Sequence, residues 1–229
     1  MEPKTFGIGL PKTGLTSMLI FARNLGFEAR GRDRRGYGLL RQGRYGEILD
    51  LYTEAEFWCD VPTPLMYKLA FERFPGARFV LTVRRDARTW YESLCRHNRF
   101  AHPLKNKHRW IFGRYYPHGF AEEHMAYYER HNREAEAWLR ARGAADRLLI
   151  LQVDTPGAAQ AFARFLGRET DATEFPRENV SAKRRLKDGS DWLKTRYNDL
   201  VQPVYARWAP RLLPAMPAQL LPIEPEALR

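Results

Sequence analysis

Near its N-terminus the chain contains Phe6-Gly7-Ile8-Gly9-Leu10-Pro11-Lys12-Thr13-Gly14-Leu15-Thr16-Ser17. This pattern predicts a strand, a glycine-containing loop and then a helix from Thr16 to about Leu25. The first N–H groups of a helix have no partner within the helix and lie at the positive end of its dipole, so an anion is stabilised there. Lys12 adds a mobile positive charge, and the hydroxyl groups of the loop are further donors. We therefore predict a loop that binds phosphate or sulfate.

The position of the lysine distinguishes this loop from that of nucleotide triphosphatases. Their pattern requires a lysine directly after the second glycine, whereas Leu15 follows Gly14 here and the lysine lies inside the loop. The displaced form, Pro-Lys-Thr-Gly-x-Thr-Ser, resembles the 5′-phosphosulfate loop of sulfotransferases that use 3′-phosphoadenosine 5′-phosphosulfate (PAPS). The resemblance implies that the donor is bound by Pro11, Lys12, Thr13, Gly14, Leu15, Thr16 and Ser17, with Lys12 also catalytic. For the loop alone, a purely structural turn between strand and helix is the alternative interpretation.

A second segment supports the same interpretation. Residues 78–83 are a β-branched and aromatic run of strand length, and Arg84-Arg85-Asp86 follows them. Ligands of parallel sheets bind beyond the carboxyl ends of the strands, so this basic end is expected near the first loop. Arg85 and Ser93, eight residues apart, resemble the 3′-phosphate site of the family, where a guanidinium fork and a hydroxyl hold the phosphate. Taken alone, an Arg-Asp pair at a strand end is most often a surface ion pair.

A candidate base lies between these two motifs. Residues 57–60 predict a short strand, and two prolines end it before a helix from Leu65 to Phe74. Sulfuryl transfer needs a base near the attacking atom, and a carboxylate can serve. The cytosolic branch of the family has a histidine at this place and other branches have a carboxylate, which makes Asp60 the candidate here. The alternative is a structural aspartate that caps the next helix.

The later part of the chain carries weaker signals. Residues 147–153 predict a strand buried on both faces, and a helix that ends at Gly167 follows them. Asp154, just after that strand, could instead hold a metal in a phosphotransferase. The basic stretch 177–189 is either a solvated loop or, by the resemblance, a loop over the 3′-phosphate with candidates Lys183, Arg184 and Arg185.

Residues 99–119 are rich in basic and aromatic side chains, which favours a substrate-binding lid, with a packed surface excursion as the alternative. The candidate acceptor contacts there are His102, Tyr115, Tyr116 and His118. The histidines are irregularly spaced and no cysteine or carboxylate cluster accompanies them, so we predict no metal site. A long helix is expected over residues 120–142.

The whole chain is consistent with one α/β domain over residues 1–229. We predict a three-layer α/β/α fold with a central parallel sheet, built from strands near residues 4–9, 27–30, 57–60, 78–83 and 147–153, and a C-terminal tail over residues 209–229. Two cysteines are too few for a disulfide framework, and the absence of a signal-peptide pattern favours a reducing cytoplasm. No apolar run is long enough for a membrane span.

The formal net charge of +11 admits nucleic acid as a partner, but no nucleic-acid-binding motif accompanies it. The arginine-rich run 31–36 predicts a flexible solvated loop. We therefore predict a PAPS-dependent sulfotransferase that acts on a hydroxyl or amine of a small-molecule, glycan or lipid acceptor, releases 3′-phosphoadenosine 5′-phosphate (PAP) and requires no metal. The alternatives are a small-molecule kinase that uses ATP and Mg²⁺, and a noncatalytic nucleic-acid-binding protein.

Overall fold

The computed structural model describes residues 3–102, 111–176, 189–213 and 222–228. The contacts divide the chain into two compact units. The first comprises residues 1–84, 131–178 and 221–229, and the second comprises residues 85–130 and 179–220. The predicted boundaries of a single domain are not decided by this division.

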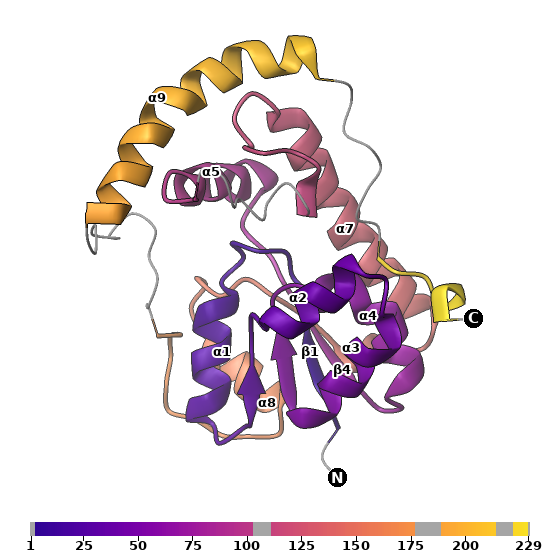
Figure 1. The fold of residues 1–229 in the computed structure, drawn as a ribbon. Coiled ribbons are helices and arrows are strands. Elements are labelled where there is room, and N and C mark those ends of the chain that lie inside the picture. Colours follow the sequence, from indigo (N-terminus) through magenta and orange to yellow (C-terminus); the bar gives the residue numbers. More distant parts are fainter. Residues whose placement is uncertain (1–2, 103–110, 177–188, 214–221, 229) are drawn as a thin grey trace. The chain divides into compact units, whose positions relative to one another are not determined.

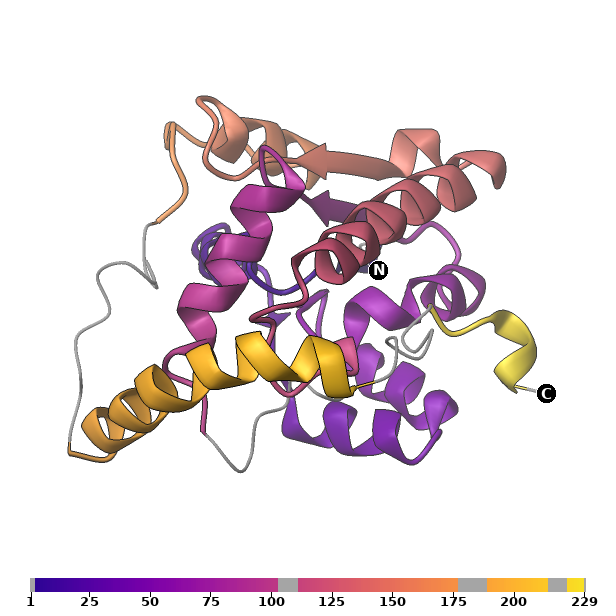
Figure 2. The same ribbon diagram turned by 90° about the horizontal axis from the view of Figure 1, so that it is seen from above.

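The first unit is built on a sheet of five strands (Figures 1 and 2). The strands are β1 (Thr5–Gly7), β2 (Ala29–Arg30), β3 (Phe57–Cys59), β4 (Arg78–Thr82) and β5 (Leu148–Leu151). Their order is β2-β3-β1-β4-β5, and every neighbouring pair is parallel. The predicted α/β class and parallel sheet are therefore confirmed. Because β1 is the middle strand, the loop that follows it opens at the centre of the sheet's carboxyl edge.

Helices cover both faces of this sheet. They are α1 (Leu15–Asn24), α2 (Arg34–Arg41), α3 (Tyr45–Leu51), α4 (Thr63–Arg73), α8 (Ala158–Phe165) and the C-terminal part of α7 (Ala121–Ala141). Short 3₁₀ turns occupy residues 52–54, 145–147 and 225–228.

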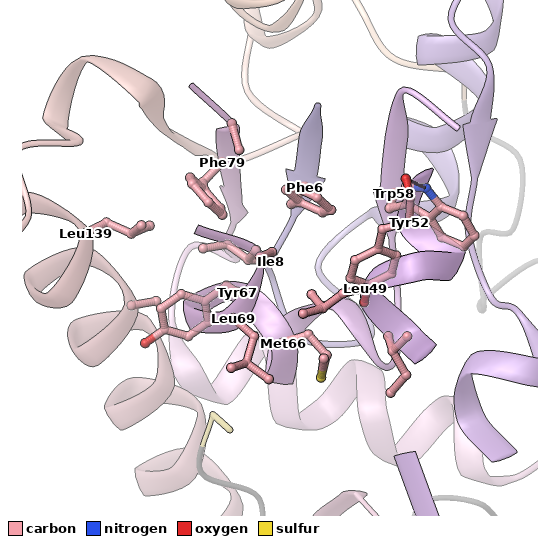
Figure 3. Close-up of a cluster of buried hydrophobic side chains, with 14 of the residues drawn as sticks. Phe6, Ile8, Leu49, Tyr52, Trp58, Met66, Tyr67, Leu69, Phe79 and Leu139 are labelled. Carbon is pink, nitrogen blue, oxygen red and sulfur yellow. Dashed lines mark hydrogen bonds between the residues drawn. The ribbon is translucent and has the colours of Figure 1, made fainter. Parts of the chain in front are cut away.

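Alternation along the strands divides the core into two clusters. Phe6, Trp58 and Phe79 pack against side chains of α3, α4 and α7 (Figure 3). Phe57 directly precedes Trp58, and Val80 directly follows Phe79. Both pack on the other face of the sheet, against α1 and α8. Successive residues of a strand point to opposite faces, so both faces are apolar and both are covered. The result is the predicted three-layer arrangement.

Two local predictions are wrong. The strand β5 was expected to be buried on both faces, but it lies at the sheet edge and Ile150 is 40% exposed. The run 31–36 was expected to be a loop, but α2 starts at Arg34 because the Asp33 carboxylate accepts hydrogen bonds from the N–H groups of the first turn. The helix α9 extends to Leu212, so its last residues lie within the range 209–229 that we expect to be the C-terminal tail.

The second unit holds α5 (Ala87–Asn98), the N-terminal part of α7, and α9 (Gly189–Leu212). Trp90 of α5 is fully buried and stacks on Tyr128 of α7 with 4.7 Å between ring centroids. Asn198 and Gln202 of α9 donate hydrogen bonds to the main-chain carbonyl of Asn98 at the end of α5. Since the last carbonyls of a helix lack partners within the helix, these bonds tie α9 to α5.

Candidate functional site

The predicted anion-binding loop lies between β1 and α1. Lys12 has φ of 79° and Gly14 has φ of 104°, whereas Thr13 between them has no positive φ. When residues with a left-handed backbone conformation alternate with residues of other conformation, successive N–H groups point toward one side and form a concavity that can bind an anion. The helix α1 begins at Leu15 with no side-chain cap and no acidic residue in its first turn. Thr16 is exposed and Ser17 is half-buried, so both remain accessible to a ligand.

The side chain of Thr13 holds the loop together. It is fully buried, and its Oγ1 lies 2.7 Å from the carbonyl oxygen of Leu10 and 2.6 Å from Oγ1 of Thr82. A carbonyl only accepts and a hydroxyl has one proton, so Thr13 donates to Leu10 and Thr82 donates to Thr13. This differs from the expectation that the Thr13 hydroxyl donates to a ligand. The main-chain N–H of Thr13, and not its hydroxyl, is therefore the predicted donor to an anion.

Arg84 fixes the loop from the end of β4. Its Nε donates to the main-chain carbonyl of Lys12 at 2.8 Å, and its Nη1 lies 3.1 Å from Oδ2 of Asp154. The carboxylate that could have held a metal therefore forms an ion pair with the arginine that supports the loop. Among the described residues, no group of three or more His, Cys, Asp and Glu side chains could hold a metal ion.

His131 of α7 supports the strand that leads into the loop. The ring is 3% exposed, and Nε2 lies 2.8 Å from the main-chain carbonyl oxygen of Ile8. Because the carbonyl only accepts, Nε2 carries the proton and donates. Burial lowers the pKa of His131 to about 4, and the hydrogen bond to Ile8 opposes that shift. The imidazole is thus neutral at pH 7, and its plane is nearly perpendicular to the ring of Tyr67, with 6.4 Å between the ring centroids.

Two glycines allow the close packing around the loop. A Cβ on Gly9 would lie 2.0 Å from Oγ1 of Thr82 and 2.5 Å from its carbonyl oxygen. A Cβ on Gly14 would lie 2.2 Å from Val153, and the φ of Gly14 is one that L residues rarely adopt. Glycine is therefore required at both positions for steric reasons.

Asp60 follows β3, which pairs directly with β1, so it lies at the same edge of the sheet as the loop. Its φ is 66°, and its Oδ1 accepts a hydrogen bond from the Val61 N–H at 2.8 Å. The helix α4 begins at Thr63 without a side-chain cap, so the aspartate does not cap it through its carboxylate. Its main-chain carbonyl accepts the Thr63 N–H at 2.8 Å instead.

Comparison with protein families identifies the class of protein to which the chain belongs. A family model described as a sulfotransferase domain matches residues 4–184, which is most of the chain. The chain belongs to the sulfotransferase family. A search of curated proteins finds no similar sequence. Membership supports transfer of a sulfuryl group as the general activity of this sulfotransferase.

The predicted 3′-phosphate residues of the sulfotransferase lie in the second unit. The side chain of Arg85 is 77% exposed, with Nε 3.1 Å from Oδ2 of Asp86 and Nη2 3.3 Å from Oγ1 of Thr89. Asp86 caps α5, where its carboxylate accepts the Thr89 N–H at 2.6 Å. That hydrogen bond, with those from the side chains of Thr89 and Arg85, lowers the pKa of Asp86 to about 2. Ser93 is 7% exposed on the same helix.

The predicted acceptor residues of the sulfotransferase are only partly placed. His102 is exposed and Tyr115 is half-buried, whereas Tyr116 is buried and donates to Oδ1 of Asn198 at 2.9 Å. Burial lowers the pKa of His118 below its usual value. The predicted lid also includes residues 103–110, and the predicted 3′-phosphate loop includes Lys183, Arg184 and Arg185; these lie outside the described residues. No described helix of the sulfotransferase combines the length and the apolar character needed to cross a membrane.

Sequence reasoning missed three residues that hold the loop: Thr82, Arg84 and His131. A lone threonine within an apolar strand was the available signal for Thr82, because a buried hydroxyl requires a partner. His131 offered a similar signal, since a histidine in a long helix is a polar group that must find a partner when it is buried. Nothing in the sequence indicated which partner either residue has.

Proposed function

We propose that this sulfotransferase moves the sulfuryl group of PAPS to a hydroxyl or amine of an acceptor. The observation that carries the proposal is the loop between β1 and α1, with its left-handed Lys12 and Gly14 and its helix N-terminus without a side-chain cap. The N–H groups over residues 13–17 hold the 5′-phosphate, and the hydroxyls of Thr16 and Ser17 add donors. Pro11 and Leu15 border this cradle.

The chemical step is an in-line displacement at sulfur. The acceptor oxygen or nitrogen forms a bond to sulfur while the bond between sulfur and the bridging oxygen of the donor breaks, and PAP leaves. Lys12 stabilises the negative charge that develops on the bridging oxygen. Asp60, at the same sheet edge as the loop, accepts the proton of the acceptor. The step requires no metal in this proposal.

The 3′-phosphate distinguishes PAPS from other adenine nucleotides, and we assign it to Arg85 and Ser93. An exposed guanidinium at the start of a helix offers a planar pair of donors to a phosphate. Loss of one charge-assisted contact of this kind costs about 1.5–3 kcal/mol of affinity, which corresponds to about 10–150-fold in Kd. Arg88 is the matched control, because it lies on the same helix, is similarly exposed and pairs with Glu92.

The experiment that tests the donor is a thermal shift with PAP, AMP, and ATP plus Mg²⁺ in parallel. A ligand at 100 times its Kd adds about 2.7 kcal/mol to the free energy of unfolding, which raises Tm by about 5–10 °C for a chain of this size. We expect a shift with PAP without metal, little shift with AMP, and a reduced PAP shift in Arg85→Ala but not in Arg88→Ala. A shift only with ATP and Mg²⁺ would move the protein to the kinases. No shift with any nucleotide, together with salt-sensitive binding to nucleic acid, would contradict a nucleotide site.

The base is tested separately. Asp60→Asn should lower turnover sharply and leave PAP affinity nearly unchanged, because the amide keeps the volume but loses the basicity. Asp50→Asn, at an exposed position of α3, is the control for a lost carboxylate. If Asp60→Asn retains full turnover with an acceptor found by screening, another group such as His102 or His118 takes the proton.

A further inference from the structure

The helix α9 presents an apolar face to solvent. Of the ten large apolar side chains that are exposed among the described residues, eight lie between residues 192 and 213. Seven of them recur at helical spacing: Trp192, Leu193, Tyr197, Leu200, Val204, Trp208 and Leu212, with exposed fractions from 46% to 75%. We call these seven residues the outer face of α9. Contiguous apolar surface of this kind marks a site of interaction.

The polar side chains of the same helix lie on the opposite, inner face. Thr195, Asn198 and Gln202 are each less than 8% exposed. Asn198 donates to the main-chain carbonyls of Arg99 and Ala101 at 3.0 and 2.8 Å, and Gln202 donates to that of Asn98 at 2.9 Å. These hydrogen bonds fix the rotation of α9 about its axis. The outer face is therefore held outward by specific bonds on the inner face.

The charges beside the outer face are positive. The guanidinium of Arg196 lies 5.8 Å from the ring centroid of Trp192, and those of Arg207 and Arg211 lie 5.6 Å from that of Trp208. The two carboxylates of the helix are both engaged. Asp191 is buried and binds Lys194, and Asp199 receives two hydrogen bonds from Arg99.

The exposed apolar side chains and the neighbouring arginines together indicate which kind of partner binds the outer face of α9. In a twofold contact between two copies, the same arginine-bearing surface of each copy would face the other, and both carboxylates of α9 are already engaged. An anionic bilayer surface instead supplies an apolar layer for the leucines, an interfacial layer for tryptophan and tyrosine, and negative headgroups for the arginines. We propose that the outer face of α9 docks the protein on an anionic lipid surface. This inference does not depend on the identity of the sulfuryl donor.

The test is co-sedimentation of the full chain with sucrose-loaded vesicles of phosphatidylcholine alone or with 30% phosphatidylglycerol. We expect stronger binding to the anionic vesicles and a decrease at high salt. The variant Leu193→Gln/Leu200→Gln should bind at least tenfold more weakly, because each leucine would otherwise be buried in lipid. The matched control is Leu228→Gln, which removes an exposed leucine outside α9.

The role of charge has its own pair of variants. Arg207→Gln/Arg211→Gln should lose about tenfold or more in affinity for anionic vesicles and little for neutral ones. Arg140→Gln/Arg164→Gln removes the same net charge at exposed positions elsewhere and should retain binding. If both double variants lose vesicle affinity equally, net charge alone explains the binding and the assignment to the outer face of α9 is overturned. The proposal is also overturned if the chain forms a dimer in solution that Leu200→Gln converts to a monomer, because a second copy then covers the face.

Discussion

The hydrogen bond from His131 to Ile8 predicts a stability difference that changes with pH. His131→Leu replaces the imidazole by an apolar side chain and removes the donor, which leaves a buried carbonyl without its partner. An unsatisfied buried group of this kind costs about 1–3 kcal/mol. At pH 7.5, we therefore expect the variant to unfold at a lower urea concentration. His131→Gln, whose amide can place an N–H near the position of Nε2, should recover part of the loss.

The sign of the pH effect follows from the direction of the pKa shift. The pKa of His131 is about 4 in the folded protein and about 6.5 in the unfolded chain. Below pH 6.5 the unfolded chain binds a proton that the folded protein does not, so this group makes the wild type less stable as pH falls toward 4. A shift of this size is worth about 3 kcal/mol. His131→Leu has no imidazole to protonate and does not lose this stability. The difference in the free energy of unfolding between wild type and variant should therefore shrink as pH falls and approach zero by about pH 4.5.

His124 provides the matched control on the same helix. It is also buried, its pKa is also lowered to about 4, and its Nδ1 lies 2.8 Å from the Phe120 carbonyl within the second unit. Urea unfolding followed by circular dichroism at pH 7.5, 6 and 4.5 measures both variants. His124→Leu should show a similar pH trend, yet only His131→Leu should also weaken PAP binding at 25 °C. A deficit for His131→Leu that is absent at pH 7.5, or that grows as pH falls, would refute the assigned bond and protonation state.

Three further changes test the packing of the loop and the start of α5. Gly9→Ala should lower the free energy of unfolding by about 1–3 kcal/mol or more, because its Cβ would overlap Thr82, whereas Gly46→Ala has open space and should be neutral or stabilising in the same urea titration. Arg84→Met removes the hydrogen bond to the loop carbonyl and should weaken PAP binding, measured by calorimetry, by about 1.5–3 kcal/mol. A smaller loss of affinity would show that the loop keeps its shape without this hydrogen bond. Asp86→Ala should lower Tm at pH 7, and the difference from wild type should vanish as acid protonates the cap carboxylate near pH 2; a constant difference would contradict the cap.

The sequence alone determined the elements whose cause is local. The strand before Gly9, the helix after Gly14 and the later strands were predicted correctly because alternation, glycine and proline act over a few residues. The location of the proposed anion-binding loop followed from the same local pattern. The helix α2 was missed because its two glycines lower its helix propensity, although Asp33 offered a local N-cap signal just before it.

Only the tertiary structure decided how the loop is held. Thr13 and Thr82 are 69 residues apart, Lys12 and Arg84 are 72 apart, and Ile8 and His131 are 123 apart. Sequence periodicity reports burial of a face, but it contains no information on which distant polar group satisfies a buried donor or acceptor. The edge position of β5 has the same origin, since an apolar run is equally compatible with a central and a terminal strand until the sheet order is fixed. Local chemistry thus placed the site in the chain, and long-range hydrogen bonding and packing gave it its shape.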